Sequence, residues 1–112
     1  MGKVEYSPKA QEDLWKIRAY IIENFGIDTA QKALVKITAS INRLGEYPLL
    51  GVSLSKMFDV STDYMYLFCG KNYVFYRIEG NIVKVVRVLN EQQDFLRVLF
   101  EIYIDSDEDE DQ

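Results

Sequence analysis

The sequence contains no histidine and only one cysteine, Cys69. A single cysteine cannot close a disulfide within the chain. Without histidine the chain lacks the side chain that most often transfers protons near neutral pH. It also lacks the usual nitrogen and sulfur ligands of zinc and copper sites. We therefore expect no metal, no cofactor and no imidazole-based mechanism.

Long apolar runs are also absent. No stretch approaches the roughly 18 consecutive apolar residues that a membrane-spanning helix needs. The first six residues, MGKVEY, do not contain the apolar stretch of a secretory signal. We therefore expect a cytoplasmic protein without a membrane partner.

The chain is rich in hydrophobic residues, at 48% of 112 positions, with aromatic residues at 13%. A chain of this length can bury one hydrophobic core but hardly two. We expect a single domain over residues 1–104, followed by an acidic tail over residues 105–112.

The net charge of −5 belongs largely to that tail, because six of the 18 acidic residues lie in the last eight positions. Without them, 12 acids face 13 bases, a balance that neither demands nor excludes a nucleic-acid partner. The composition predicts a disordered, solubilising tail. A tail that competes with RNA for basic residues is the alternative.

Two amphipathic helices are predicted in the first half of the chain. Ser7 and Pro8 are typical of an N-cap and a first helical position. The apolar stripe that follows consists of Ala10, Leu14, Ile17 and Ile21. After a stop at residues 24–26, Asp28 is expected to cap a second helix, whose stripe consists of Ala30, Leu34, Ile37, Ile41 and Leu44. Gly45 and Pro48 end it, so the two helices should form an antiparallel hairpin.

The second half is predicted to form a sheet. Residues 49–59 lose all periodicity and indicate a loop that carries Lys56. Residues 64–68, 73–78 and 82–89 are dense in aromatic and β-branched side chains, and short breaks between them indicate an antiparallel meander. Residues 3–6 can add an edge strand, and residues 94–104 should close the chain as a helix or an extended segment on the sheet. The expected fold is α+β, with a helical hairpin on one face of a small antiparallel sheet and the opposite face as the working surface.

Several blocks of sequence occur in a characteristic order. They are VEYSPKA at 4–10 with EDL at 12–14, INRL at 41–44 with YP at 47–48 and Gly51, TDYMYL at 62–67 with FYR at 75–77, and VRVL at 86–89 with DFLR at 94–97. Together they resemble the RelE/ParE toxin superfamily, which includes proteins once called plasmid stabilisation proteins. The resemblance implies the toxin of a type II toxin-antitoxin system, neutralised by a cognate antitoxin.

The superfamily contains two modes of action. The resemblance implies either a RelE-like mRNA interferase, an endoribonuclease that cuts messenger RNA on the ribosome, or a ParE-like toxin that poisons DNA gyrase. Since both share one fold, the fold alone does not choose between them.

RNA cleavage without a metal requires groups that stabilise the phosphate charge and transfer protons. Arg77 and Arg87 lie on successive predicted strands and could clamp a phosphate between their guanidinium groups. Glu91 is the remaining candidate for proton transfer. The structural alternative makes Arg77 a solvated residue that pairs with Glu79 or Glu91. RNA-binding candidates are Lys56, Tyr64, Lys71 and Arg97, each of which could instead be ordinary surface charge or, for the tyrosine, core.

Some positions depart from the superfamily pattern. Many relatives have an arginine at the position of Met65, a histidine at Asn90, and basic residues at Gln92 and Gln93. An amide cannot exchange protons near neutral pH as imidazole does. The sequence therefore indicates an endonuclease with a depleted site. The alternatives are a gyrase poison and a degenerate toxin that only binds its antitoxin.

Overall fold

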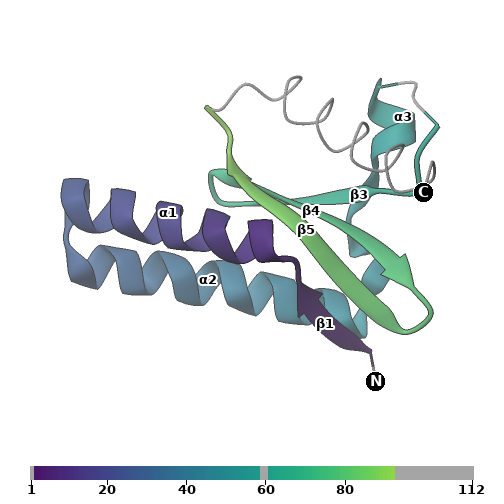
Figure 1. Cartoon of the computed structure of the whole chain (residues 1–112), viewed down its shortest axis with the longest axis horizontal. Helices are drawn as coiled ribbons and strands as arrows, with labels where there is room; N and C mark the ends of the chain where they lie inside the picture. The colour runs from purple at the N-terminus through teal and green to yellow at the C-terminus, as the bar shows by residue number, and fades with distance from the viewer. Residues whose placement is uncertain (1, 59–60, 93–112) are drawn as a thin grey trace.

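Residues 2–58 and 61–92 are described by a computed structural model, in which two long helices pack on one face of a five-stranded sheet (Figure 1). The elements are, in order, β1 (Lys3–Tyr6), α1 (Pro8–Phe25), α2 (Ile27–Glu46), the 3-10 turn η1 (Pro48–Leu50), β2 (Val52–Ser53), α3 (Leu54–Phe58), β3 (Met65–Cys69), β4 (Asn72–Glu79) and β5 (Ile82–Asn90). The predicted α+β architecture is confirmed. The predicted closing segment 94–104, with Arg97, and the tail 105–112 lie outside the described residues.

Ser7 and Gly26 mark the boundaries of the two helices in the hairpin. The Ser7 hydroxyl accepts a hydrogen bond from the Ala10 N–H at 3.0 Å, as predicted for the N-cap of α1. Gly26 alone separates α1 from α2, with φ of 95°, a conformation that glycine adopts without steric strain. Asp28 does not cap α2 but lies in its first turn. There its carboxylate faces the positive end of the helix dipole.

The main core lies between the hairpin and the sheet. Ala10, Ile37, Ile41 and Leu44 of the two predicted stripes are almost fully buried, and Leu14 and Ile17 pack against them. The sheet supplies Val74, Tyr76, Val83, Val85 and Val88 to the same cluster. Each fully buried aliphatic side chain of this kind contributes about 1.5–3 kcal/mol of transfer free energy. The sequence periodicity therefore identified the helical side of the core correctly.

The sheet has the strand order β1-β5-β4-β3-β2. Strands β3, β4 and β5 form the predicted antiparallel meander, and β1 joins an edge as expected. However, β1 runs parallel to β5, so the sheet is mixed and not wholly antiparallel. This orientation arises because the helical hairpin carries the chain away between the two strands, which frees them from the geometry of a tight turn.

The prediction of an irregular loop at 49–59 was wrong, because η1, β2 and α3 lie there. Long-range contacts stabilise this segment. The Tyr76 hydroxyl donates a hydrogen bond to the Pro48 carbonyl at 2.7 Å and accepts one from the Gly51 N–H at 3.0 Å. A side chain at Gly51 would overlap that hydroxyl and the Tyr66 carbonyl. No local periodicity signals contacts of this kind.

Replacing Tyr76 with phenylalanine should lower the free energy of unfolding by about 1–2 kcal/mol, because two part-buried backbone groups lose their partner. Burial also raises the pKa of Tyr76 above 10.0. The tyrosine's stabilisation is therefore fully present below about pH 10 and is lost as the pH rises through its folded-state pKa. Urea unfolding of both proteins at pH 8 and pH 11 should show a smaller difference at pH 11. An equal difference at both values would contradict this assignment.

A second cluster lies on the sheet face opposite the hairpin. Leu54, Phe75 and Leu89 are buried there, and Tyr64, Tyr66, Tyr73 and Val86 pack against them. The rings of Tyr73 and Phe75 are stacked, with centroids 6.1 Å apart. The face predicted to be an open working surface is therefore an apolar packing surface over much of its area.

Candidate functional site

Arg87 forms a buried ion pair with Asp13 of α1. Its Nε donates to Asp13 Oδ2 at 2.7 Å and its Nη2 donates to Oδ1 at 3.0 Å. The two side chains are 17% and 8% exposed, respectively. Such a two-bond pairing fixes the plane of the guanidinium and satisfies the carboxylate on both oxygens. Arg87 therefore joins β5 to the helical layer.

The Asp13 carboxylate also accepts a backbone hydrogen bond from the part of the β5 edge that β1 does not cover. The pairing with β1 ends at Val85, where the Ser7 N–H donates to the Val85 carbonyl at 2.9 Å. The Ser7 hydroxyl then donates to the Val86 carbonyl at 2.8 Å, and Asp13 Oδ2 accepts the Val88 N–H at 3.0 Å. Side chains at the start of α1 thus replace a neighbouring strand, and they leave these backbone groups hydrogen-bonded.

Arg77 lies on the other sheet face, in a network of opposite charges. Its Nη2 is 3.4 Å from Asp63 Oδ2 and 3.5 Å from Glu79 Oε1, and its guanidinium lies over the Tyr64 ring at 5.7 Å. Lys84 Nζ lies 2.8 Å from Glu79 Oε2, and this hydrogen bond, with the Arg77 charge, lowers the pKa of Glu79. The pairing of Arg77 with Glu79 is the structural alternative considered from the sequence.

The expected clamp of Arg77 and Arg87 across the hairpin does not form in the structure. The strand partner of Arg77 is Lys84, whereas that of Arg87 is Phe75, and the register shifts between Phe75 and Tyr76. This irregularity breaks the simple alternation of side chains on which the prediction depended. The two guanidinium groups consequently turn to opposite faces of the sheet, one toward the helices and one toward Tyr64.

The other predicted site residues fall into separate places. Lys56 is exposed on α3. Tyr64 contacts Arg77. Lys71 and Glu91 come together at the far end of the sheet, where the Glu91 N–H donates to the Lys71 carbonyl at 2.7 Å. The described residues do not gather into one catalytic centre, and the catalytic and RNA-binding roles remain predictions.

The positions that depart from the superfamily pattern have structural roles here. Met65 packs against the main core. The Asn90 side chain accepts the Gln92 N–H at 2.9 Å, which makes a local turn at the end of β5. Both residues therefore serve packing and chain reversal in this fold, and Gln93 lies beyond the described part.

A groove of about 840 Å³ runs between the helical hairpin and the turn that joins β3 to β4. Its apolar wall comes from both helices and β5, through residues such as Ile17, Ile21, Ile37 and Val88. Lys16, Lys36 and Lys71 also line it. A groove that combines an apolar wall with several lysines fits an amphipathic segment that carries acidic residues.

Asn72 marks one end of this groove. The residue is 9% exposed, and its Oδ1 atom has no hydrogen-bond partner among the described residues. A buried amide without a partner is unfavourable by about 1–3 kcal/mol. A bound peptide could supply the missing donor through a backbone N–H.

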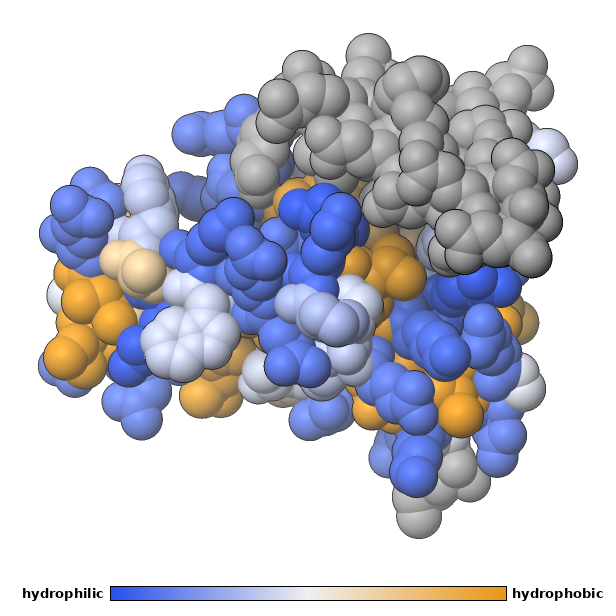
Figure 2. Space-filling model, in the orientation of Figure 1, coloured by the Kyte–Doolittle hydropathy of each residue, from blue (hydrophilic) through white to orange (hydrophobic). Residues whose placement is uncertain are grey.

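Large apolar side chains are exposed where α1 passes into α2. Tyr20 and Phe25 line the groove with exposures of 58% and 65%, and Ile27, the first residue of α2, is 62% exposed. Figure 2 shows hydrophobic side chains gathered at this end of the hairpin. An exposed apolar group next to a groove is typical of a protein-binding surface.

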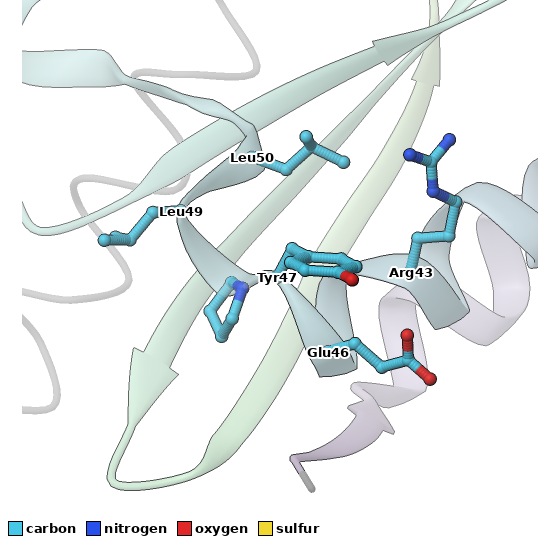
Figure 3. A pocket seen from close by; sticks show the side chains of 6 residues that line it. Arg43, Glu46, Tyr47, Leu49 and Leu50 are labelled. Carbon is cyan, nitrogen blue, oxygen red and sulfur yellow. The ribbon is translucent and has the colours of Figure 1, made fainter.

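A second, open hollow of about 580 Å³ lies at the other end of α2. In Figure 3 the side chains of Arg43 and Glu46 extend from the end of α2 beside the Tyr47 ring, while Leu49 points away. None of the residues that line this hollow is a buried polar residue, so the groove beside the helical hairpin is the better candidate binding site.

Sequence reasoning missed Asp13, Asn72, Tyr20 and Phe25. A signal for Asp13 was available, because a carboxylate three residues after Ala10 lies on the buried face of a helix and therefore requires a partner. Asn72, Tyr20 and Phe25 have no comparable sequence signal, because they line a groove that forms only where the two helices meet the turn between β3 and β4.

Residues 2–58 and 61–92 contain neither a metal-binding cluster nor a membrane-spanning helix. Among them, no set of three or more histidine, cysteine, aspartate or glutamate side chains is arranged to hold a metal ion. No helix in this part combines the length and apolar character required to cross a membrane.

Comparison with known proteins identifies the family. A solved structure described as "Chromosomal ParDE TA system from P. aeruginosa" shares the fold, with a TM-score of 0.68 and 18% identity over 80% of this chain and 96% of that chain. None of the curated proteins matches the sequence. The family model described as "ParE toxin of type II toxin-antitoxin system, parDE" matches residues 4–95. The chain therefore belongs to the ParE toxin family of type II toxin-antitoxin systems, which implies an antitoxin partner.

Proposed function

We propose that this toxin arrests growth by binding DNA gyrase and not by cutting RNA. The observation that carries the proposal is the buried pair of Arg87 and Asp13. Because its Nε and Nη2 edge is held by the Asp13 carboxylate, Arg87 cannot offer that edge as a two-bond fork to a scissile phosphate, and the Asp13 charge weakens its attraction for one. Arg87 therefore has a structural role, because it joins β5 to α1, a helix that lines the candidate protein-binding groove.

The remaining charged candidates favour the same proposal. Arg77 faces two carboxylates, which reduce the local positive potential that a phosphate requires. Glu91 lies beside Lys71, whereas Arg77 lies toward the Glu79 end of β4. A ribosome-dependent endonuclease that uses Arg77, Arg87, Glu91 and Lys56 stays a prediction from the sequence, and the geometry supports it less well.

The test compares two targets with one preparation of the purified toxin. We expect the toxin to inhibit supercoiling of relaxed plasmid by purified gyrase, and addition of the cognate antitoxin to restore it. Cell-free translation of a reporter should continue at the same toxin concentration. Inhibited translation with active gyrase would instead establish the RelE-like activity. If neither process were inhibited while the antitoxin still bound, the chain would be a binding remnant of the toxin fold.

The antitoxin surface supported best by the geometry is the hairpin groove. Its apolar wall can take hydrophobic side chains of the antitoxin, and Lys16, Lys36 and Lys71 can pair with acidic residues beside them. The Asn72 Oδ1 atom, which has no partner among the described residues, adds a polar contact that would fix the register of the bound segment.

A further inference from the structure

Exposed apolar side chains gather where α2 ends and the chain passes through η1 into β2. Tyr47, Leu49, Leu50 and Val52, which we call the η1 patch, are all between 46% and 76% exposed. The first three line the open hollow of Figure 3, and Val52 lies on β2, an edge strand of the sheet. An open hollow with exposed apolar side chains suits another protein surface better than a small molecule, which binds in a more enclosed pocket.

Two opposite charges lie beside the η1 patch. Arg43 and Glu46 both line the hollow, and within residues 2–58 and 61–92 neither forms an ion pair. Their spacing on α2 allows pairing, yet in Figure 3 their charged ends point away from each other. A complementary surface therefore needs a carboxylate for Arg43 and a cation for Glu46, with apolar groups beside them.

A second copy of this chain carries that arrangement. In a contact between two copies related by a two-fold axis, the same surface is used twice, so each of two different residues faces the other in the partner copy. With the axis between Arg43 and Glu46, the arginine of each copy faces the glutamate of the other. The apolar side chains of the two η1 patches then meet beside these pairs.

We propose that the toxin forms a homodimer through the η1 patch, with reciprocal ion pairs between Arg43 and Glu46. Four side chains of this size and exposure offer roughly 300–600 Å² of apolar surface in each copy. A contact of that size lies at the lower end for specific interfaces, so we expect a reversible dimer with a micromolar Kd. This inference does not depend on the proposed gyrase target.

A dimer of this kind leaves the hairpin groove of each copy open. The hollow and the groove share no lining residue. Ile37 is the last residue of α2 that lines the groove, and it precedes Arg43 by nearly two helical turns, about 9 Å along the axis. The dimer therefore presents two grooves, and each of them can bind its own antitoxin segment.

The first test exchanges charges in the full-length protein. Sedimentation velocity over a series of micromolar concentrations should show a monomer–dimer equilibrium. Arg43→Glu makes both reciprocal pairs acidic and Glu46→Arg makes both basic, so each variant alone should dimerise at least tenfold more weakly. An equimolar mixture of the two variants should recover the dimer, because every pair across the contact is then attractive. A natural protein that stays monomeric, or a mixture that stays as weak as its components, would overturn the proposal.

The second test introduces a carboxylate at one of two exposed apolar positions. Leu49→Asp should abolish the dimer, because it buries a charge in the apolar contact. Val35→Asp is the matched control, since Val35 is 60% exposed on α2 and lines neither the hollow nor the groove. It should leave the dimer intact, and both variants should bind the antitoxin as the natural protein does. Equal loss of the dimer in both variants would place the contact elsewhere, and loss of antitoxin binding with Leu49→Asp would assign the patch to the antitoxin; either result contradicts the proposed homodimer.

Discussion

Replacing Asp13 with alanine is expected to lower the free energy of unfolding by about 3–5 kcal/mol, the usual loss when one member of a buried ion pair is removed. The substitution leaves the Arg87 guanidinium, 17% exposed, without its carboxylate and deprives the Val88 N–H of its acceptor. Asp13→Asn should be less damaging, because an amide oxygen can still accept from Val88. Urea denaturation at neutral pH measures both effects.

Asp63→Ala is the matched control, because Asp63 also pairs with an arginine but is 65% exposed. Surface pairs of this kind contribute about 0–1 kcal/mol, so this substitution should be nearly neutral. A double-mutant cycle with Arg87→Ala should give a coupling energy well above that of the Asp63 and Arg77 cycle. If the two aspartates had similar effects, Arg87 would not be held by Asp13, and its role in phosphate binding would again be the better explanation.

Much of the fold could be predicted from the sequence because it depends on local patterns. The stripes that include Ala10, Ile37 and Ile41 repeat at helical spacing, and each belongs to the buried cluster of the structure. The β-branched and aromatic runs likewise identified β3, β4 and β5 to within one residue at most boundaries. Local signals were sufficient wherever one face of an element meets one core.

The segment between α2 and β3 could not be predicted, because tertiary contacts determine it. Its η1 turn is anchored by the hydroxyl of Tyr76, which lies 28 residues after Pro48. The hydrogen bonds that fix this turn do not appear in any periodicity of residues 49–59. The parallel pairing of β1 has a similar origin, since β5 is distant in sequence.

The candidate site was predicted less well than the fold, for a reason that Arg87 illustrates. Its partner Asp13 lies 74 residues earlier, and neither residue type nor spacing connects the two. The register shift between Phe75 and Tyr76 then reversed the assumption that Arg77 and Arg87 share a face. By contrast, Tyr76 and Arg77 lie on opposite faces of β4, as simple alternation requires of neighbours in one strand.

The largest expected effect on binding concerns the groove residues Tyr20 and Phe25. Truncating both to alanine should weaken binding of the cognate antitoxin by roughly 30-fold or more, since buried aromatic anchors typically contribute 2 kcal/mol or more at an interface. Both side chains are mostly exposed in the free toxin, so stability should change by less than about 0.5 kcal/mol. Titration calorimetry with the antitoxin measures the affinity, and thermal unfolding measures the stability.

Trp15→Ala provides the control for these two substitutions. Trp15 lies on the same helix and is 68% exposed, but it does not line the groove and instead lies near the Arg18 guanidinium. Its truncation removes a larger aromatic surface and should nevertheless leave antitoxin affinity unchanged. In cells, the Tyr20 and Phe25 double variant should escape neutralisation, whereas the Trp15 variant should remain neutralised. A greater loss of affinity from Trp15→Ala would move the antitoxin surface away from the groove to the outer face of α1.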